Sequence, residues 1–232
     1  MSKHPFHDCR GVLFDFGGTL DSDGEHWLDR FCEMYTQAAL DVPLSEIKRA
    51  FYAADDQCCK DPKVNCMGLR SLMTLHVHLQ FKNLGLKDEA RERALVERFC
   101  EKSERFLRRN AQLLHGIRER FQLGVVSNFY GNVAILCEEA GLGRSLDVIL
   151  DSIRVGVGKP DPEIFQKALG ALELNPQEAV FVGDSYERDM IPARYLGMRT
   201  VWLRGSKPRI PLNAGSVDAS ISSLTELESL IP

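Results

Sequence analysis

The sequence lacks the features that would place a chain in a membrane or direct it out of the cell. None of its apolar runs is long enough to span a bilayer, and its first eight residues lack the apolar segment of a signal peptide. Positive charge is not in excess either, because the net charge is −4. A basic face that binds nucleic acid or anionic lipid is therefore not expected. We expect a soluble cytoplasmic protein with no nucleic-acid or membrane partner.

Cysteine pairs are missing as well. The seven cysteines are odd in number and irregularly spaced, a pattern typical of reduced thiols rather than of a disulfide framework. The group Cys58, Cys59, Cys66, His76 and His78 has no paired C-x-x-C spacing, which argues against a zinc site. A chain of 232 residues, 44% of them hydrophobic, can instead be stabilised by a buried core in one large domain or two smaller ones.

The most informative stretch of the sequence surrounds Asp15. An apolar run, Val12 to Phe14, ends at this residue and is followed by Gly17 and Gly18, which fits a strand buried on both faces of a parallel sheet. Ligands of such sheets bind outside the carboxyl ends of the strands, so Asp15 is expected at the edge of a crevice. The glycines would let the backbone turn tightly and approach a ligand. Taken alone, however, Asp15 fits better an Asx-type turn that simply ends a strand.

Between residue 25 and about residue 110, apolar residues recur at helical spacing and no strand is expected. The four stripes comprise Trp27, Phe31, Met34, Tyr35 and Ala38; Ile47, Ala50, Phe51 and Ala54; Leu69, Leu72, Met73, Leu75, Leu79 and Phe81; and Leu95, Phe99, Phe106 and Leu107. The fourth helix is expected over residues 87–109. An insertion of helices directly after the first strand is well placed to form a lid over the crevice.

From residue 111 onward, helices and strands alternate. Strands are expected at 123–127, 147–151, 179–183, 199–203 and 217–221, with helices at 113–121, 132–140, 161–174 and 189–196 and a surface loop at 207–215. This alternation predicts right-handed crossovers and a parallel sheet between two layers of helices. The predicted fold is therefore α/β, with a Rossmann-like three-layer core from residues 1–21 and 111–232 and an α-helical cap from residues 22–110.

Polar residues stand at the ends of four of these strands. They are Asp15, Ser127 with Asn128, Lys159, and Asp184 with Asp189. Each has an ordinary explanation alone, as a helix cap, a loop cation or the end of a strand. Together they offer carboxylates for a hard divalent cation, a lysine for negative charge, and a hydroxyl with an amide for oxygen atoms. Oxygen ligands of this kind suit Mg²⁺ beside a phosphate.

With these residues in place, the chain resembles the haloacid dehalogenase-like hydrolase superfamily, in its group with a helical cap after the first strand. The resemblance covers essentially the whole chain. Its four motifs, each at the end of an expected strand, match Asp15–Leu20, Val125–Asn128, Gly158–Phe165 and Gly183–Asp189. Four motifs in this order are a specific signal, whereas any one of them alone would be weak.

The resemblance implies a hydrolase that acts on a small phosphorylated molecule, as a monomer or homodimer. Asp15 would attack phosphorus and form an aspartyl-phosphate. The residues implied in catalysis are Asp15, Lys159 and Thr19. Those implied in phosphate binding are Ser127, Asn128, Gly18 and Lys159. Those implied as Mg²⁺ ligands are Asp15, the backbone carbonyl of Gly17, Asp184 and Asp189.

One position departs from the family's phosphatases. They usually carry a second Asp two residues after the nucleophile, which protonates the leaving oxygen, and here that residue is Gly17. Because general acid–base help is typically worth about 10²–10⁴-fold, its loss leaves three interpretations open. In the first, the chain is a phosphatase whose proton comes from Asp21, Asp23, a cap residue or water, or whose leaving group needs little help. In the second, it performs other chemistry of the family. In the third, it has lost catalysis and binds a ligand or protein.

Two members of the family without that Asp are dehalogenases and phosphonoacetaldehyde hydrolases. Against the first, the fourth motif retains Asp184 and Asp189, as in the metal-binding version of the motif. Against the second, no cap lysine clearly matches the one that forms a Schiff base in that enzyme. The candidate cap lysines are Lys48, Lys60, Lys63 and Lys82.

Overall fold

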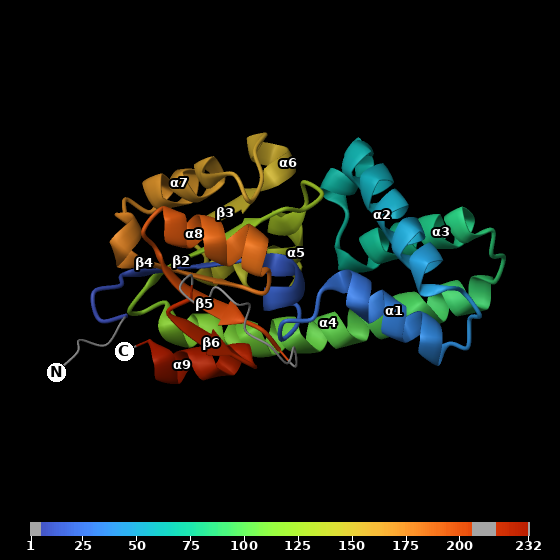
Figure 1. Ribbon diagram of the computed structural model, residues 1–232, viewed down its shortest axis with the longest axis horizontal. Helices are drawn as coiled ribbons and strands as arrows, with labels where there is room; N and C mark the ends of the chain where they lie inside the picture. Colours follow the sequence, from blue (N-terminus) through green and yellow to red (C-terminus); the bar gives the residue numbers. More distant parts are fainter. Residues whose placement is uncertain (1–5, 206–216, 232) are drawn as a thin grey trace.

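The computed structural model describes residues 6–205 and 217–231. At its centre is a six-stranded sheet in the order β3-β2-β1-β4-β5-β6, and every neighbouring pair is parallel (Figure 1). The strands are β1 (Gly11–Phe14), β2 (Gln122–Ser127), β3 (Val148–Asp151), β4 (Ala179–Gly183), β5 (Arg199–Leu203) and β6 (Ala219–Ile221). The predicted α/β fold with a Rossmann-like parallel sheet is confirmed. The loop expected at 207–215 lies outside the described residues.

Asp15 directly follows strand β1, which lies inside the sheet between β2 and β4. All four residues of β1 are buried, since β2 covers one edge and β4 the other. Phe14 pairs with Val125 on one side and Val182 on the other, and the amide of Asp15 donates to the carbonyl of Val182 at 2.9 Å. Because neighbouring strands run in the same direction, their carboxyl ends reach the same edge of the sheet as Asp15.

Helices cover both faces of the sheet. Val12 and Phe14 point into one hydrophobic layer, which also contains residues of α4 and α5, whereas Leu13 points into another, which contains residues of α7. This alternation of strand side chains between two layers gives the three-layer core. The core helices are α5 (Val133–Glu139), α6 (Ser152–Val155), α7 (Pro162–Ala171), α8 (Ile191–Tyr195) and α9 (Leu227–Leu230).

The inserted segment is helical, as predicted, and lies beyond the end of the sheet that carries Asp15 (Figure 1). It contains α1 (Trp27–Gln37), α2 (Leu44–Lys60), α3 (Leu69–Leu84) and the first part of α4 (Glu89–Ile117); we call this segment the cap. Each predicted stripe contributes one fully buried phenylalanine to the cap: Phe31, Phe51, Phe81 and Phe99. Within the described residues, no helix combines the length and apolar character needed to cross a membrane.

One prediction about the helices is wrong. Instead of separate helices at 87–109 and 113–121, a single helix, α4, runs from Glu89 to Ile117. The buried stripe continues through Leu107, Asn110 and Leu114, because the polar side chain of Asn110 donates to the carbonyl of Leu20 at 2.7 Å. The expected boundary between cap and core at residue 110 therefore falls inside a helix, and the division into two domains stays a prediction.

A buried ion pair joins the cap to the segment after Asp15. Arg30 of α1 donates to Asp21 Oδ2 at 2.9 Å, and both side chains are almost fully buried. The same guanidinium donates to the carbonyl of Phe99 and to the hydroxyl of Ser103 in α4. It also lies 3.8 Å above the centre of the Phe99 ring, a favourable cation–π geometry. The charge of Arg30 is therefore paired with the Asp21 carboxylate, while its Nε has no hydrogen-bond partner among the described residues.

We predict that Arg30→Met lowers the free energy of unfolding by about 3–5 kcal/mol, because it leaves the Asp21 carboxylate buried without its cation. Urea denaturation would measure this change. Lys60→Met is the matched control, since Lys60 pairs with Asp56 at 2.6 Å while both side chains are well exposed; an exposed pair of this kind contributes less than about 1 kcal/mol. Equal effects of the two substitutions would contradict the role given to Arg30.

Candidate active site

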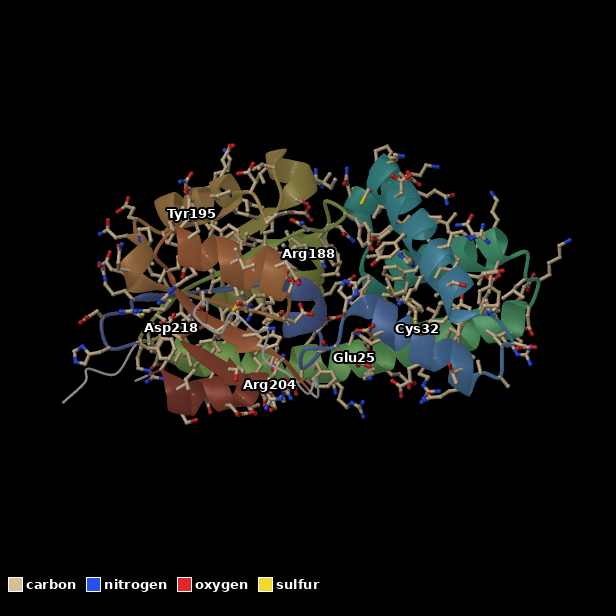
Figure 2. The ribbon with its side chains drawn as sticks, in the orientation of Figure 1. Glu25, Cys32, Arg188, Tyr195, Arg204 and Asp218 are labelled. Carbon is tan, nitrogen blue, oxygen red and sulfur yellow. The ribbon has the colours of Figure 1, made fainter. Side chains whose placement is uncertain are left out.

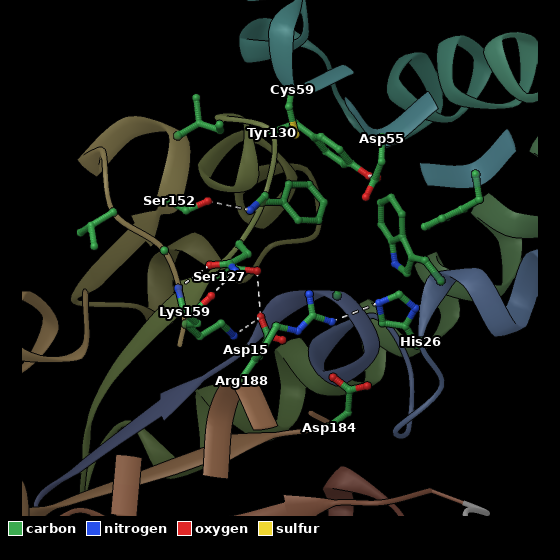
Figure 3. Close-up of a pocket in the computed structure, with 18 of the residues that line it drawn as sticks. Asp15, His26, Asp55, Cys59, Ser127, Tyr130, Ser152, Lys159, Asp184 and Arg188 are labelled. Carbon is green, nitrogen blue, oxygen red and sulfur yellow. Dashed lines mark hydrogen bonds and ion pairs between the residues drawn. The ribbon is translucent and has the colours of Figure 1, made fainter. Parts of the chain in front are cut away.

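The carboxylate of Asp15 is held by donors from three segments of the chain. Its Oδ1 accepts the amide of Phe16 at 2.7 Å and the hydroxyl of Ser127 at 2.8 Å. Lys159 Nζ lies 2.9 Å from the same oxygen, as Figure 3 shows. Within the described part of the chain, all three contacts fall on Oδ1, so Oδ2 is the oxygen left for a metal ion or an electrophile.

Lys159 is buried between two carboxylates. Its Nζ lies 2.9 Å from Asp15 Oδ1 and 2.7 Å from Asp189 Oδ1. Burial opposes the charge of Lys159, but the two carboxylates outweigh it and raise the pKa of the ammonium group. For Asp189, burial and the nearby Asp15 raise the pKa of the carboxyl group to about 6, although Lys159 opposes this shift.

Asn128 fixes the backbone of Lys159. Its amide nitrogen donates to the Lys159 carbonyl at 2.7 Å, and its Oδ1 accepts the Lys159 amide, also at 2.7 Å. Two hydrogen bonds from one side chain hold the lysine in a single position beside Asp15. In the sequence, Asn128 was expected to bind phosphate; its direct contacts in the structure are with Lys159.

The three carboxylates could hold a divalent cation. Oxygens of Asp15, Asp184 and Asp189 lie within 4.8 Å of one another, and octahedral Mg²⁺ needs ligand oxygens roughly 3–4 Å apart. Asp189 is the least available of the three, because Lys159 contacts its Oδ1 and the amide of Ser185 donates to its Oδ2 at 3.0 Å. The residues present therefore fit Mg²⁺, with Asp15 and Asp184 as the better placed ligands.

Gly18 and Thr19 lie beside the site rather than in its wall. Gly18 has a φ of +85°, and a Cβ there would come within 2.7 Å of the Asp184 carboxylate, so only glycine fits. Its amide donates to Asp21 Oδ1 at 2.7 Å. The hydroxyl of Thr19 is buried without a hydrogen-bond partner among the described residues. The phosphate-binding role of Gly18 and the catalytic role of Thr19 stay predictions.

Two carboxylates considered as proton donors are engaged elsewhere. Besides Gly18 and Arg30, Asp21 accepts the indole N–H of Trp27 at 2.6 Å. Asp23 accepts two hydrogen bonds from Arg109 and one from the amide of Leu224. Neither residue lines the cavity above Asp15. Of the proton sources considered, a cap residue and water remain.

That cavity has a volume of about 420 Å³ and lies between the cap and the carboxyl edge of the sheet (Figure 3). Asp15, Gly17, Ser127, Asn128, Lys159 and Asp184 line it, as expected for a single site. Sequence analysis missed several other polar groups in its wall: His26, Asp55, Tyr130, Ser152 and Arg188. Of these, only Arg188 lies inside a recognised motif; the others come from the cap and from loops that no motif covers.

His26 and Arg188 meet on one side of the cavity. Figure 2 places Arg188 at the border between core and cap, and its guanidinium lies 3.5 Å from His26 Nε2. His26 begins helix α1, where its Nδ1 accepts the amide of Leu28 at 3.2 Å. Arg188, exposed at the cavity, has no carboxylate partner within the described residues.

Comparison with known proteins identifies the class to which this fold and site belong. A family model described as haloacid dehalogenase-like hydrolase matches residues 9–197. The chain therefore belongs to the haloacid dehalogenase-like hydrolases, and the resemblance found in its four motifs is confirmed.

Individual relatives carry different names. Haloacid dehalogenase-like hydrolase domain-containing protein 3 of Bos taurus is 38% identical over 120 residues, which are 51% of this chain and 47% of that protein. Phosphoserine phosphatase of Thermus thermophilus is 42% identical over 89 residues, 38% of this chain and 35% of that protein. The chain thus matches less than half the length of these curated relatives. A crystal structure of a dehalogenase matches 97% of this chain and 98% of its own, with a TM-score of 0.64 and 18% identity, a likeness of fold alone.

We predict that Asn128→Ala lowers kcat for hydrolysis about 10²-fold without unfolding the protein, because a displacement of about 1 Å at a reacting group can have an effect of that size. Steady-state kinetics would measure the change, and a thermal melt would check folding. Asn175→Ala is the matched control, since Asn175 only caps a surface turn through Glu178. An Asn128→Ala enzyme as active as this control would disprove the positioning role.

Proposed function

We propose that the chain is a Mg²⁺-dependent phosphatase that hydrolyses a small phosphorylated molecule through an aspartyl-phosphate on Asp15. The observation that carries this proposal is the arrangement of Asp15: its Oδ1 is held by Lys159, Ser127 and a backbone amide, while its Oδ2 remains for reaction. Asp184 stands in the same cavity. This geometry suits a nucleophilic carboxylate beside a cation and a phosphate.

The reaction would take place in two displacements. In the first, a carboxylate oxygen of Asp15 bonds to phosphorus, and the bond from phosphorus to the leaving oxygen breaks. In the second, water bonds to phosphorus, the bond to Asp15 breaks, and phosphate is released. Lys159 would offset the charge of the carboxylate and of the phosphoryl oxygens. Mg²⁺, held by Asp15 and Asp184, would supply further positive charge to the phosphate when bound.

Dehalogenation is the second candidate, and Gly17 is the observation that favours it, because the acid of the usual phosphatase is absent. The carboxylate cluster favours phosphate chemistry, since three acidic groups around one point suit a cation. The name of the Thermus thermophilus relative, a phosphoserine phosphatase, also supports action on a phosphate ester. We therefore rank phosphatase first.

We predict that the protein hydrolyses p-nitrophenyl phosphate and acetyl phosphate only with Mg²⁺ and that Asp15→Asn lowers kcat at least about 10³-fold, because the amide is no nucleophile. Phosphate release would be measured with and without EDTA. Asp41→Asn, at an exposed position, is the control. Chloride release from 2-chloropropionate without Mg²⁺ would favour dehalogenation instead. Ligand binding without turnover of either kind would indicate a binding protein.

We predict that Gly17→Asp raises kcat for alkyl phosphates, by about 10²-fold if the missing acid limits turnover, and changes turnover of acetyl phosphate much less. The backbone at Gly17, with φ of −72° and ψ of 122°, accepts any residue, and a Cβ there would lie 3.7 Å from Trp27 and 3.8 Å from Phe129, an ordinary contact. Gly17→Asn, equal in size but without the acid, is the control. Equal effects on alkyl and acyl substrates would refute this explanation.

A further inference from the structure

The cap contributes one carboxylate to the cavity. Asp55 of α2 lines the cavity together with Tyr130, which follows β2 in the core. Figure 3 shows the two side chains meeting above the space that Asp15 borders from below. Arg188 and Lys159 line the same cavity from the core. The cavity therefore has cations near the nucleophile and a separate carboxylate at its cap end.

A chain of hydrogen bonds that starts at the buried side chains of Gln80 and His76 orients Asp55. Gln80 Nε2 donates to His76 Nδ1 at 2.9 Å, so a neutral His76 carries its proton on Nε2, which lies 3.3 Å from Asp55 Oδ1. Tyr130 donates its hydroxyl proton to the same oxygen. Burial and the nearby Asp55 raise the pKa of Tyr130 well above its usual value, so Tyr130 stays a donor. Among the described residues, Asp55 Oδ2 has no hydrogen-bond partner.

Aromatic rings line the same cavity as this carboxylate. Trp27, Phe51 and Tyr130 all line the cavity, and the ring centres of Trp27 and Tyr130 are 6.2 Å apart. Aromatic faces attract cations, most strongly when the cation is shielded from water. A carboxylate oxygen without a partner, set among aromatic rings, is a site for an organic cation and would repel a second anion of the substrate.

We propose that the leaving group of the substrate carries an ammonium group that binds Asp55 Oδ2 against these rings, so that the substrate class is a phosphate monoester of an amino alcohol. This inference rests on the proposed function, because it places the phosphate at Asp15. The cavity of about 420 Å³ has room for a phosphate and a short aminoalkyl chain. Asp55 is then the residue that determines specificity, and its orientation depends on His76 and Tyr130.

The test compares two ligands that differ only in the charged end, 3-aminopropylphosphonate and butylphosphonate. Neither can be hydrolysed, so isothermal titration calorimetry with Mg²⁺ measures binding independently of turnover. The wild-type protein should bind the ammonium ligand at least about tenfold more tightly, in keeping with a shielded cation–π contact and a carboxylate. Asp55→Asn should bring the ratio of the two dissociation constants close to one, while its amide oxygen can still accept the Tyr130 proton.

Two further variants distinguish a specificity contact from a structural one. Asp56→Asn removes the neighbouring carboxylate, which is exposed and pairs with Lys60, and should leave the ratio as in the wild type. Tyr130→Phe removes the hydrogen bond from Tyr130 to Asp55 but keeps the charge of Asp55, and should weaken both ligands while preserving most of the ratio. If Asp55→Asn instead weakens both ligands equally, Asp55 only joins cap to core and the inference is wrong.

A wild-type ratio near one, or no binding of either ligand, also overturns the inference. Its failure is separable from that of the proposed function. A protein that hydrolyses p-nitrophenyl phosphate but shows no preference between the ligands remains a phosphatase with another substrate. A protein that shows the preference but hydrolyses no phosphate ester keeps the cation site and loses the proposed activity.

Discussion

The candidate site depends on one buried ammonium group between two carboxylates. Lys159 contacts Asp15 at 2.9 Å and Asp189 at 2.7 Å, and a charge withdrawn from water at this depth is tolerated only when it is well paired. Asp189 is in turn held by a backbone amide, and the lysine backbone by Asn128. Positive charge is thus fixed beside Asp15 before any ligand arrives, the kind of preorganised arrangement that can stabilise developing negative charge.

The arrangement also explains why the cap and the core share the site. The segment after Asp15 leads directly into the cap. Its Asp21 carboxylate accepts hydrogen bonds from Gly18, Trp27 and Arg30. The turn after Asp15 and the first cap helix are therefore fixed by the same side chain. Asp55 and Tyr130 make a second connection between cap and core, and both residues of this connection line the cavity.

The sequence predicted the sheet well because its strands are short, apolar and followed by turn residues; β4 and β5 were placed at their observed bounds. The motif residues Asp15, Ser127, Lys159 and Asp184 were expected in one crevice for the same reason, since parallel strands end at one edge. The continuity of α4 was missed because Asn110 is a polar residue in a buried stripe, and only its contact with Leu20 explains that position. The roles of Asp55 and His26 depend on tertiary contacts between cap and core, which no local pattern encodes.

The unbroken course of α4 limits how substrate can enter. With 29 residues the helix is about 44 Å long, and it runs beneath both the cap and the sheet (Figure 1). A continuous helix shared by the cap and the core opposes a hinge motion that would separate them. Entry of a ligand then requires α1–α3 to slide over α4, or the whole of α4 to tilt. Arg109 of α4 also donates to Asp23, which accepts the amide of Leu224, so this contact would resist such a tilt.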